Sequence, residues 1–288
     1  KRTCPLCSLD MTRKLWFGPS GIPLSTGGKG IVAGVKSIRK LGLEAMELAF
    51  VQSVYIRSEE KAKEVDCARQ QENIRLSVHA PYYINLNAAK KETMDASIER
   101  LYLACKMGAL CGAESVAVHA AFRHQDDSKT ISRKILEACI QIYEKLDADG
   151  LKIKIAPEFA GKKSQWGNLE EVMEIARETH MGWCMDFGHA HATSNGSLTT
   201  KEKFDELFST IEKFDANYLK DLYIQCCGIT YTEKGEQYHT SFDSNESTLS
   251  WKAMAESFKT FNVGGICITE CLGQEKDAIL LKKYYESL

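Results

Sequence analysis

Short apolar runs alternate with longer amphipathic segments along the chain. The short runs are rich in β-branched or small apolar residues, which predicts strands buried on both faces of a parallel sheet. The longer segments carry apolar residues at helical spacing, and two of them begin with the capping residues Ser58 and Asn168. Eight strand–helix pairs follow one another, with strands expected over 15–21, 45–52, 75–82, 115–120, 152–159, 182–189, 217–225 and 264–270. This order predicts an α/β fold.

The spacing of the strand ends favours a closed barrel. From Pro19 to Glu270 the ends recur roughly every 36 residues, slightly above the ~31 per unit of an ordinary (β/α)8 barrel. An open doubly wound sheet is the alternative, but polar residues end six or more strands, and only a ring brings that many ends to one point. With five prolines and no Ser/Gly-rich linker, we expect a single TIM barrel over 15–288 after an N-terminal extension, 1–14.

Composition narrows the functional classes. The chain has 288 residues, of which 44% are hydrophobic and 26% charged, which is ordinary for a globular protein. Its net charge of −2 provides no overall positive electrostatic field that would attract nucleic acid. No apolar run approaches the roughly 18 residues of a membrane span, so no membrane association is expected. The eleven cysteines are scattered and odd in number, and no secretion signal is visible, so a reduced, cytoplasmic location is expected. Cys4 and Cys7 form a CxxC without a second pair, which we interpret as an incidental or weakly functional tail.

Imidazole and carboxylate side chains end many of the apolar runs. They are His79, His119, Glu158, Asp186 and Glu270, with His189 one turn beyond Asp186 and His239 in the long connection that follows Gln225. Several carboxylates meeting at one barrel mouth would repel one another without a cation. This set of ligands, which contains no thiolate, suits zinc, manganese or iron(II). A hydrogen-bonded mouth that holds an organic substrate is the alternative. His191 is interpreted as a ligand or as a support for one, and His124 and His180 as surface residues.

Six motifs follow one another between Leu15 and the C-terminus. They are HAPYYINL, VAVHA, APEFAG, MDFGHAH, GITYTEKGEQYH and GGICITE. Together they resemble the endonuclease IV family of apurinic/apyrimidinic endonucleases, which are xylose-isomerase-like TIM barrels, and the style of the loops is closer to archaeal members. The resemblance implies a DNA-repair hydrolase that incises double-stranded DNA 5′ to abasic sites. It also implies one to three zinc ions, with manganese possible, and we expect a monomer.

The resemblance also implies roles for particular residues. His79 and His119 would hold one metal, with Glu158 and Glu270 contributing. Glu158 would bridge to a second metal that also takes Asp186, and as the catalytic residue it would orient or deprotonate the attacking water. His189 and His239 would hold the third metal. Tyr82 and Asn85 would contact DNA, the tyrosine entering the base stack beside the lesion. The basic residues Lys90, Lys91, Arg123, Lys162 and Lys163 are expected either at phosphates or on an ordinary surface.

The chain departs from the family pattern at two positions. Gln225 stands where the family has a ligand histidine, and Gln237 stands where it has a ligand aspartate two residues before His239. An amide is a weak zinc ligand, so both are possible degenerate metal positions unless Glu236 or Asp221 compensates. Two alternatives therefore stay open. One is a metal-dependent sugar isomerase or epimerase with a single metal. The other is a catalytically weakened barrel that binds DNA or acts as a scaffold.

Overall fold

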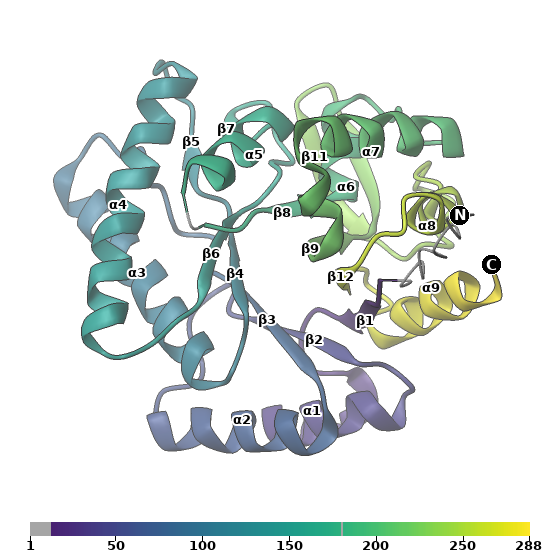
Figure 1. Cartoon of the computed structure of the whole chain (residues 1–288), viewed down its shortest axis with the longest axis horizontal. Coiled ribbons are helices and arrows are strands. Elements are labelled where there is room, and N and C mark those ends of the chain that lie inside the picture. The colour runs from purple at the N-terminus through teal and green to yellow at the C-terminus, as the bar shows by residue number, and fades with distance from the viewer. Residues whose placement is uncertain (1–12, 180) are drawn as a thin grey trace, which may run out of the picture.

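The computed structural model describes residues 13–179 and 181–288, in which eight parallel strands form a ring (Figure 1). One half of the ring contains, in spatial order, Leu15–Pro19 (β1), Gly265–Thr269 (β12), Leu222–Cys226 (β9) and Cys184–Asp186 (β8). The other half contains Ala45–Ala49 (β2), Arg75–His79 (β3), Ser115–Val118 (β4) and Lys154–Pro157 (β6). Parallel bridges from Ser20 to Glu47 and from Glu158 to Cys184 join the halves. The predicted (β/α)8 barrel is confirmed, while Cys4, Cys7 and His180 lie outside the described residues.

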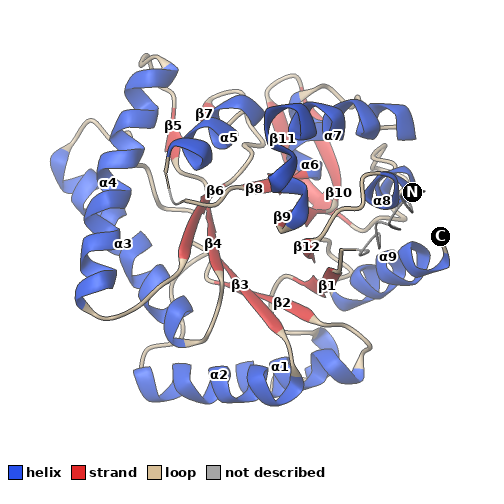
Figure 2. Cartoon of the chain, in the orientation of Figure 1, coloured by secondary structure: helices blue, strands red, loops and turns tan. Residues whose placement is uncertain are grey.

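Helices surround the ring of strands (Figure 2). They are Ile31–Lys40 (α1), Glu59–Glu72 (α2), Lys91–Leu110 (α3), Ser128–Ala148 (α4), Leu169–Glu178 (α5), Lys201–Asp215 (α7), Trp251–Thr260 (α8) and Glu275–Ser287 (α9). Strand residues alternate between the helix-covered core and the barrel interior, so that Met46 and Leu48 pack outward and Ala45 packs inward. Between residues 13 and 288, leaving out residue 180, no helix has the length and apolar composition needed to cross a bilayer.

All eight expected strands are shorter than predicted, and in two of them a helical segment replaces the missing part. The strand expected over 182–189 ends at Asp186, which caps a short helix, Phe187–Thr193 (α6), by accepting a hydrogen bond from the His189 backbone N–H at 2.7 Å. The strand expected over 217–225 begins only at Leu222, because a 3-10 helix, Ala216–Lys220 (η2), precedes it. His189 therefore projects from a helical turn at the barrel mouth, next to the carboxylate that caps it.

Additional short elements extend the barrel mouth. A hairpin of Gly228–Thr232 (β10) and Gly235–Thr240 (β11) follows β9, and a two-residue ladder joins Ala121–Phe122 (β5) to Gln165–Trp166 (β7). A 3-10 turn, Leu24–Thr26 (η1), follows β1. All of these elements belong to loops that leave the carboxyl ends of strands, which is where TIM barrels carry their chemistry.

The start of α5 depends on one buried carboxylate. Glu171 forms a capping box with Asn168, accepts hydrogen bonds from the Gly167 and Asn168 backbone N–H groups at 2.9 Å, and pairs with Arg123 at 2.7 Å. Glu171→Ala is expected to lower the free energy of unfolding by about 3 kcal/mol, because it removes the cap and leaves Arg123 unpaired. Urea denaturation measures this loss. The matched exposed change Glu170→Ala should cost less than about 0.5 kcal/mol. Equal losses in the two variants would contradict the prediction.

Candidate metal centre

The residues singled out at the strand ends converge at the carboxyl end of the barrel. Three groups have potential ligand atoms within 4.8 Å of one another: His79 with His119 and Glu158; Glu158 with Asp186 and His189; and His189 with Glu236 and His239. Successive groups share a residue, so the three adjoin across the mouth. Six of the seven metal ligands expected from the sequence thus lie in this arrangement, and Glu236 joins them.

The first group brings two imidazoles to one carboxylate. Oε2 of Glu158 lies 3.3 Å from Nε2 of His79, and its Oε1 lies 3.8 Å from Nδ1 of His119. Nδ1 of His79 is 2.7 Å from the Ala80 carbonyl oxygen, which can only accept a hydrogen bond. The proton of a neutral His79 is therefore on Nδ1, and the lone pair of Nε2 points toward Glu158. This orientation is typical of metal-binding histidines.

The group formed by His189, Glu236 and His239 repeats this orientation. Nδ1 of His189 donates to the Phe159 carbonyl at 2.9 Å, and Nδ1 of His239 is 3.3 Å from the Glu270 carbonyl. Their Nε2 atoms lie 2.8 Å and 3.8 Å from Oε2 of Glu236. Two imidazole nitrogens with free lone pairs thus face one carboxylate, which is a common donor set for zinc.

Glu236 reaches this group because of a β-bulge in the hairpin. Thr230 of β10 pairs with Tyr238, but the next residue, Tyr231, pairs with Glu236, which leaves Gln237 as an extra residue without a partner. Since strand residues alternate between faces, the extra residue puts Glu236 and His239 on the same face. Gln237 is exposed. Gln237 stays a possible degenerate metal position, and Glu236, which the sequence offers as the compensating residue, provides the carboxylate of this group.

The middle group contains the most deeply buried carboxylates. Asp186 and Glu158 are almost completely buried, and Nδ1 of His189 lies 3.7 Å from Oδ2 of Asp186 and 2.9 Å from Oε1 of Glu158. The proton on that nitrogen is directed to the Phe159 carbonyl, so neither carboxylate oxygen receives a hydrogen bond from it. These oxygens are left facing one another across the barrel mouth.

Gln225 is a hydrogen-bonding residue here. Its Nε2 donates to Oε2 of Glu47 and to Oε1 of Glu270, both at 3.0 Å, and its Oε1 accepts from the Cys184 thiol at 3.0 Å. The amide is therefore held with its nitrogen toward the two carboxylates and its oxygen toward sulfur. Because the oxygen is occupied, Gln225 does not present a free metal-binding atom. Gln225 therefore stays a possible degenerate metal position, and its amide is hydrogen-bonded to neighbouring side chains.

Glu47 is a buried site residue that the pattern of strand ends does not single out. Ser20 donates to its Oε1 at 2.7 Å, and Tyr223 and Gln225 donate to its Oε2. Ser20 comes this close because β1 and β2 nearly touch at Gly18, where a Cβ would lie 1.7 Å from the Ala45 carbonyl oxygen. A carboxylate between inward-facing alanines was the signal that could have identified it.

The crowding of imidazoles and carboxylates at the barrel mouth shifts their pKa values. Burial alone would lower the pKa of His79, but the adjacent carboxylate of Glu158 outweighs it and raises the pKa to about 10. Burial lowers the pKa of His119 to about 4. Burial, together with the charges of Glu47 and nearby carboxylates, raises the pKa of Glu270 well above its ordinary value. Without a cation the protein must therefore keep protons in the cluster, since the carboxylates cannot all ionise together.

Orphaned buried atoms provide a direct test of whether metal ions fit this centre. Nδ1 of His119, both carboxylate oxygens of Glu158 and Oδ2 of Asp186 are buried and have no hydrogen-bond partner among residues 13–179 and 181–288. A buried polar atom without a partner costs roughly 1–3 kcal/mol, and more when the group is charged. Divalent cations would satisfy all four atoms and neutralise the carboxylates. The residues therefore fit a metal centre.

Tyr82 and Asn85 differ in their availability. The Tyr82 ring stacks on His119 with centroids 5.7 Å apart and is half exposed, so it covers one side of the first group and also faces solvent. Oδ1 of Asn85 accepts hydrogen bonds from the backbone N–H groups of Asn87 and Phe122 at 3.0 and 3.2 Å. Asn85 is thus engaged in joining two loops, while Tyr82 is free to meet a ligand.

Other candidate residues lie outside the centre. Nε2 of His191 donates to Thr248 at 2.9 Å, and its Nδ1 accepts from the Leu198 backbone N–H at 3.1 Å, so both ring nitrogens serve local structure. His124 is exposed, as expected. Asp221 pairs with Arg75 at 2.9 Å at the amino end of the barrel and cannot compensate for a missing ligand.

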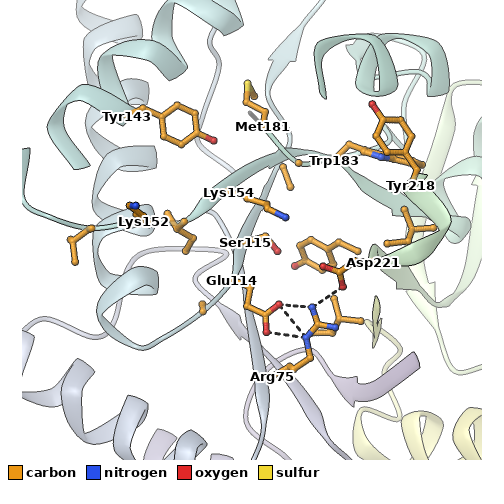
Figure 3. Close-up of a pocket in the computed structure, with 18 of the residues that line it drawn as sticks. Arg75, Glu114, Ser115, Tyr143, Lys152, Lys154, Met181, Trp183, Tyr218 and Asp221 are labelled. Carbon is orange, nitrogen blue, oxygen red and sulfur yellow. Dashed lines mark hydrogen bonds and ion pairs between the residues drawn. The ribbon is translucent and has the colours of Figure 1, made fainter. Parts of the chain in front are cut away.

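A cavity of about 1060 Å³ opens at that amino end (Figure 3). Arg75, which is also bound by Glu114, lies on one side of it, and Lys154 and Trp183 line other parts of its wall. Residues at this end of a TIM barrel ordinarily serve stability, whereas the catalytic groups lie at the carboxyl end. The metal-centre residues do not line this cavity.

Comparisons with known proteins agree with this geometry. A family model described as the xylose isomerase-like TIM barrel matches residues 35–284. The chain is 33% identical to the uncharacterized protein MJ0133 of Methanocaldococcus jannaschii over 277 residues, which is 95% of this chain and 98% of that protein. It is 23% identical to a probable endonuclease 4 of Mycobacterium leprae over 213 residues, which cover 72% and 77% of the two chains.

Solved structures in two functional classes have the same fold. Endonuclease IV from Thermus thermophilus superposes with a TM-score of 0.68 at 17% identity, covering 96% of this chain and 100% of that one. A D-tagatose 3-epimerase-like protein superposes with a TM-score of 0.66 at 18% identity, covering 94% and 97%. At these identities the likeness concerns the fold alone. The chain belongs to the xylose isomerase-like TIM barrel family.

Proposed function

We propose that this protein is a metal-dependent phosphodiesterase that incises double-stranded DNA 5′ to abasic sites. The observation that carries the proposal is the arrangement of three adjoining ligand groups at one barrel mouth, with the Nε2 atoms of His79, His189 and His239 turned toward carboxylates. A row of adjoining cation positions suits a phosphodiester, whose attacking, equatorial and leaving oxygens all need stabilisation. The sequence similarity to a probable endonuclease 4 supports the same reaction.

Glu158 is the proposed catalytic residue. Bound divalent cations would lower the pKa of water and stabilise negative charge on the phosphate and on the leaving oxygen. The carboxylate of Glu158 is buried between the imidazoles of His79 and His119 on one side and His189 on the other. It is therefore placed to orient the attacking water and to accept its proton.

Tyr82 is proposed to fill the space left by the missing base. Its ring is half exposed and stacked on His119, so it projects from the metal centre toward solvent. Moving an abasic nucleotide out of the duplex is inexpensive because no base pair has to be broken. An aromatic ring that stacks on the neighbouring bases would hold the duplex open beside the lesion.

Phosphate contacts are assigned to a smaller set of basic residues than the sequence indicates. Arg123 pairs with the buried Glu171 at 2.7 Å, and Lys162 lies 3.5 Å from Glu236. Lys91 pairs with Asp95 on its own helix. Lys90 and Lys163 are exposed and are the basic residues proposed to contact the DNA backbone.

A sugar isomerase or epimerase is the second candidate. It is favoured by the fold likeness to the D-tagatose 3-epimerase-like protein and by the set of oxygen donors on Glu158, Asp186 and Glu270, which would suffice for one ion. Such an enzyme would hold a ketose and move a proton beside a carbonyl. The outer ligand group of His189, Glu236 and His239 would then have no function. Phosphodiester hydrolysis therefore accounts for more of the ligand groups at the barrel mouth.

Incision of a labelled duplex that carries one abasic-site analogue tests the proposal. Protein loaded with zinc and manganese should cut 5′ to the lesion, and exhaustive chelation should reduce the rate by at least about a hundredfold until metal is restored. An undamaged duplex of the same sequence is the control. Absence of incision by the loaded protein, together with turnover of a ketose, would overturn the proposal in favour of the epimerase.

A further inference from the structure

Gln225 and Glu47 determine which donor atoms face the middle of the metal centre. The β9 residue that faces this position is Gln225, whose side-chain nitrogen lies 3.0 Å from both Glu47 and Glu270. An amide nitrogen carries hydrogens and no lone pair for a metal. Its oxygen is taken by the Cys184 thiol, so rotation of the amide would break three hydrogen bonds. The β9 strand thus contributes no ligand.

Glu47 fixes this orientation of the Gln225 amide. Its carboxylate is fully buried and accepts from Ser20 and Tyr223 as well as from Gln225. A carboxylate has only acceptor atoms, so the group beside it must donate. The nitrogen of Gln225 is the donor, and a flipped amide would place two oxygens against each other. Glu47 therefore determines which end of the amide faces the centre.

His189 does not make up for the missing ligand. Its Nδ1 is close to Asp186 and Glu158, but the proton on that nitrogen is directed to the Phe159 carbonyl at 2.9 Å. Its free nitrogen, Nε2, faces Glu236 on the other side of the ring. The middle position is therefore left with carboxylate oxygens alone. Among them, Oδ2 of Asp186 and both oxygens of Glu158 are buried and unpartnered.

We propose that the metal centre is heterometallic, with zinc at the two imidazole-rich positions and a harder divalent ion, manganese or magnesium, at the oxygen-only position between them. Imidazole donors suit zinc, whereas carboxylates suit manganese and magnesium. The two outer groups each contain two histidines and one carboxylate. The middle one combines the carboxylates of Glu158 and Asp186 with His189, whose near nitrogen is directed to the Phe159 carbonyl. The inference rests on the metal centre of the proposed function and not on its DNA substrate.

Metal competition tests this assignment without any substrate. Metal-free full-length protein would be reconstituted with about four equivalents of zinc per chain and a large excess of manganese, because zinc generally binds a given site more tightly. It would then be desalted and analysed for metal per chain and for the electron paramagnetic resonance of bound manganese. Two zinc ions and one manganese ion per chain are expected. Three zinc ions without manganese would overturn the proposal, and so would manganese that added zinc displaces completely.

Two glutamine-to-histidine variants sharpen the test. Gln225→His offers a nitrogen donor to the middle position, so zinc should rise toward three per chain and bound manganese should fall by at least about tenfold. Gln237→His makes the same chemical change at the exposed bulge residue and should match the wild type. Bound manganese that is unchanged in a folded Gln225→His variant would overturn the proposal.

Circular dichroism and thermal melting would show whether Gln225→His folds, and if it does not, the wild-type competition decides alone. The experiment also separates this inference from the proposed function. Mixed metal content without incision of abasic DNA would sustain the inference and defeat the nuclease. Incision of abasic DNA by protein that holds three zinc ions would sustain the nuclease and defeat the inference.

Discussion

Glu158→Gln is expected to abolish incision of abasic DNA, with a loss of roughly 10³-fold or more. Both oxygens of Glu158 are buried and belong to two ligand groups at once, so this one residue would serve two cation positions. Glutamine keeps the shape of the side chain but has no charge and presents an N–H₂ group toward the cations. The same change removes the proposed acceptor of the water proton.

Metal analysis should accompany the rate measurement for this variant. The metal content of Glu158→Gln should fall by one or two ions per chain, because the first and middle groups both depend on this carboxylate. Glu233→Gln, at an exposed position in the hairpin, makes the same change outside the centre and should leave rate and metal content within about twofold of wild type. Incision at the wild-type rate by Glu158→Gln would place the catalytic carboxylate elsewhere.

The residues recovered from sequence share one physical property. His79, Glu158 and Asp186 lie at or directly after the ends of buried strands, where a polar side chain interrupts an apolar run. In a parallel barrel all such ends meet at one mouth, so order along the chain is enough to predict proximity. The fold was predictable for the same reason, since eight apolar runs separated by helical segments leave few other topologies.

The residues that were missed depend on geometry without a local signal. Glu47 lies in the middle of a strand, followed by Leu48 and Ala49, so no run ends there and only the inward alternation marks it. The amide orientation of Gln225 is determined by Glu47 and Cys184, which are distant in the chain. A donor's position in the sequence therefore does not reveal whether it points at a metal or at another side chain.

The hairpin provides the sharpest contrast between spacing and structure. Family spacing favours Gln237 as the partner of His239, because residues two apart share a face of a regular strand. The bulge at Gln237 reverses this rule and brings Glu236 to His189 at 2.8 Å. Glu236→Ala is therefore expected to remove one zinc ion per chain and to slow incision by at least about a hundredfold, because two histidines cannot hold the ion as tightly without a carboxylate.

Gln237→Ala is the matched control for this loss. It alters the neighbouring residue on the same strand, which is exposed and unpaired in the hairpin, and should keep full zinc content and a rate within about twofold of wild type. Metal analysis and the incision assay on the same protein samples give both values. If Gln237→Ala lost the zinc ion and Glu236→Ala kept it, the hairpin would have the regular register and the bulge would not form in solution. The pair of variants therefore decides between family spacing and bulge geometry as the rule for this ligand.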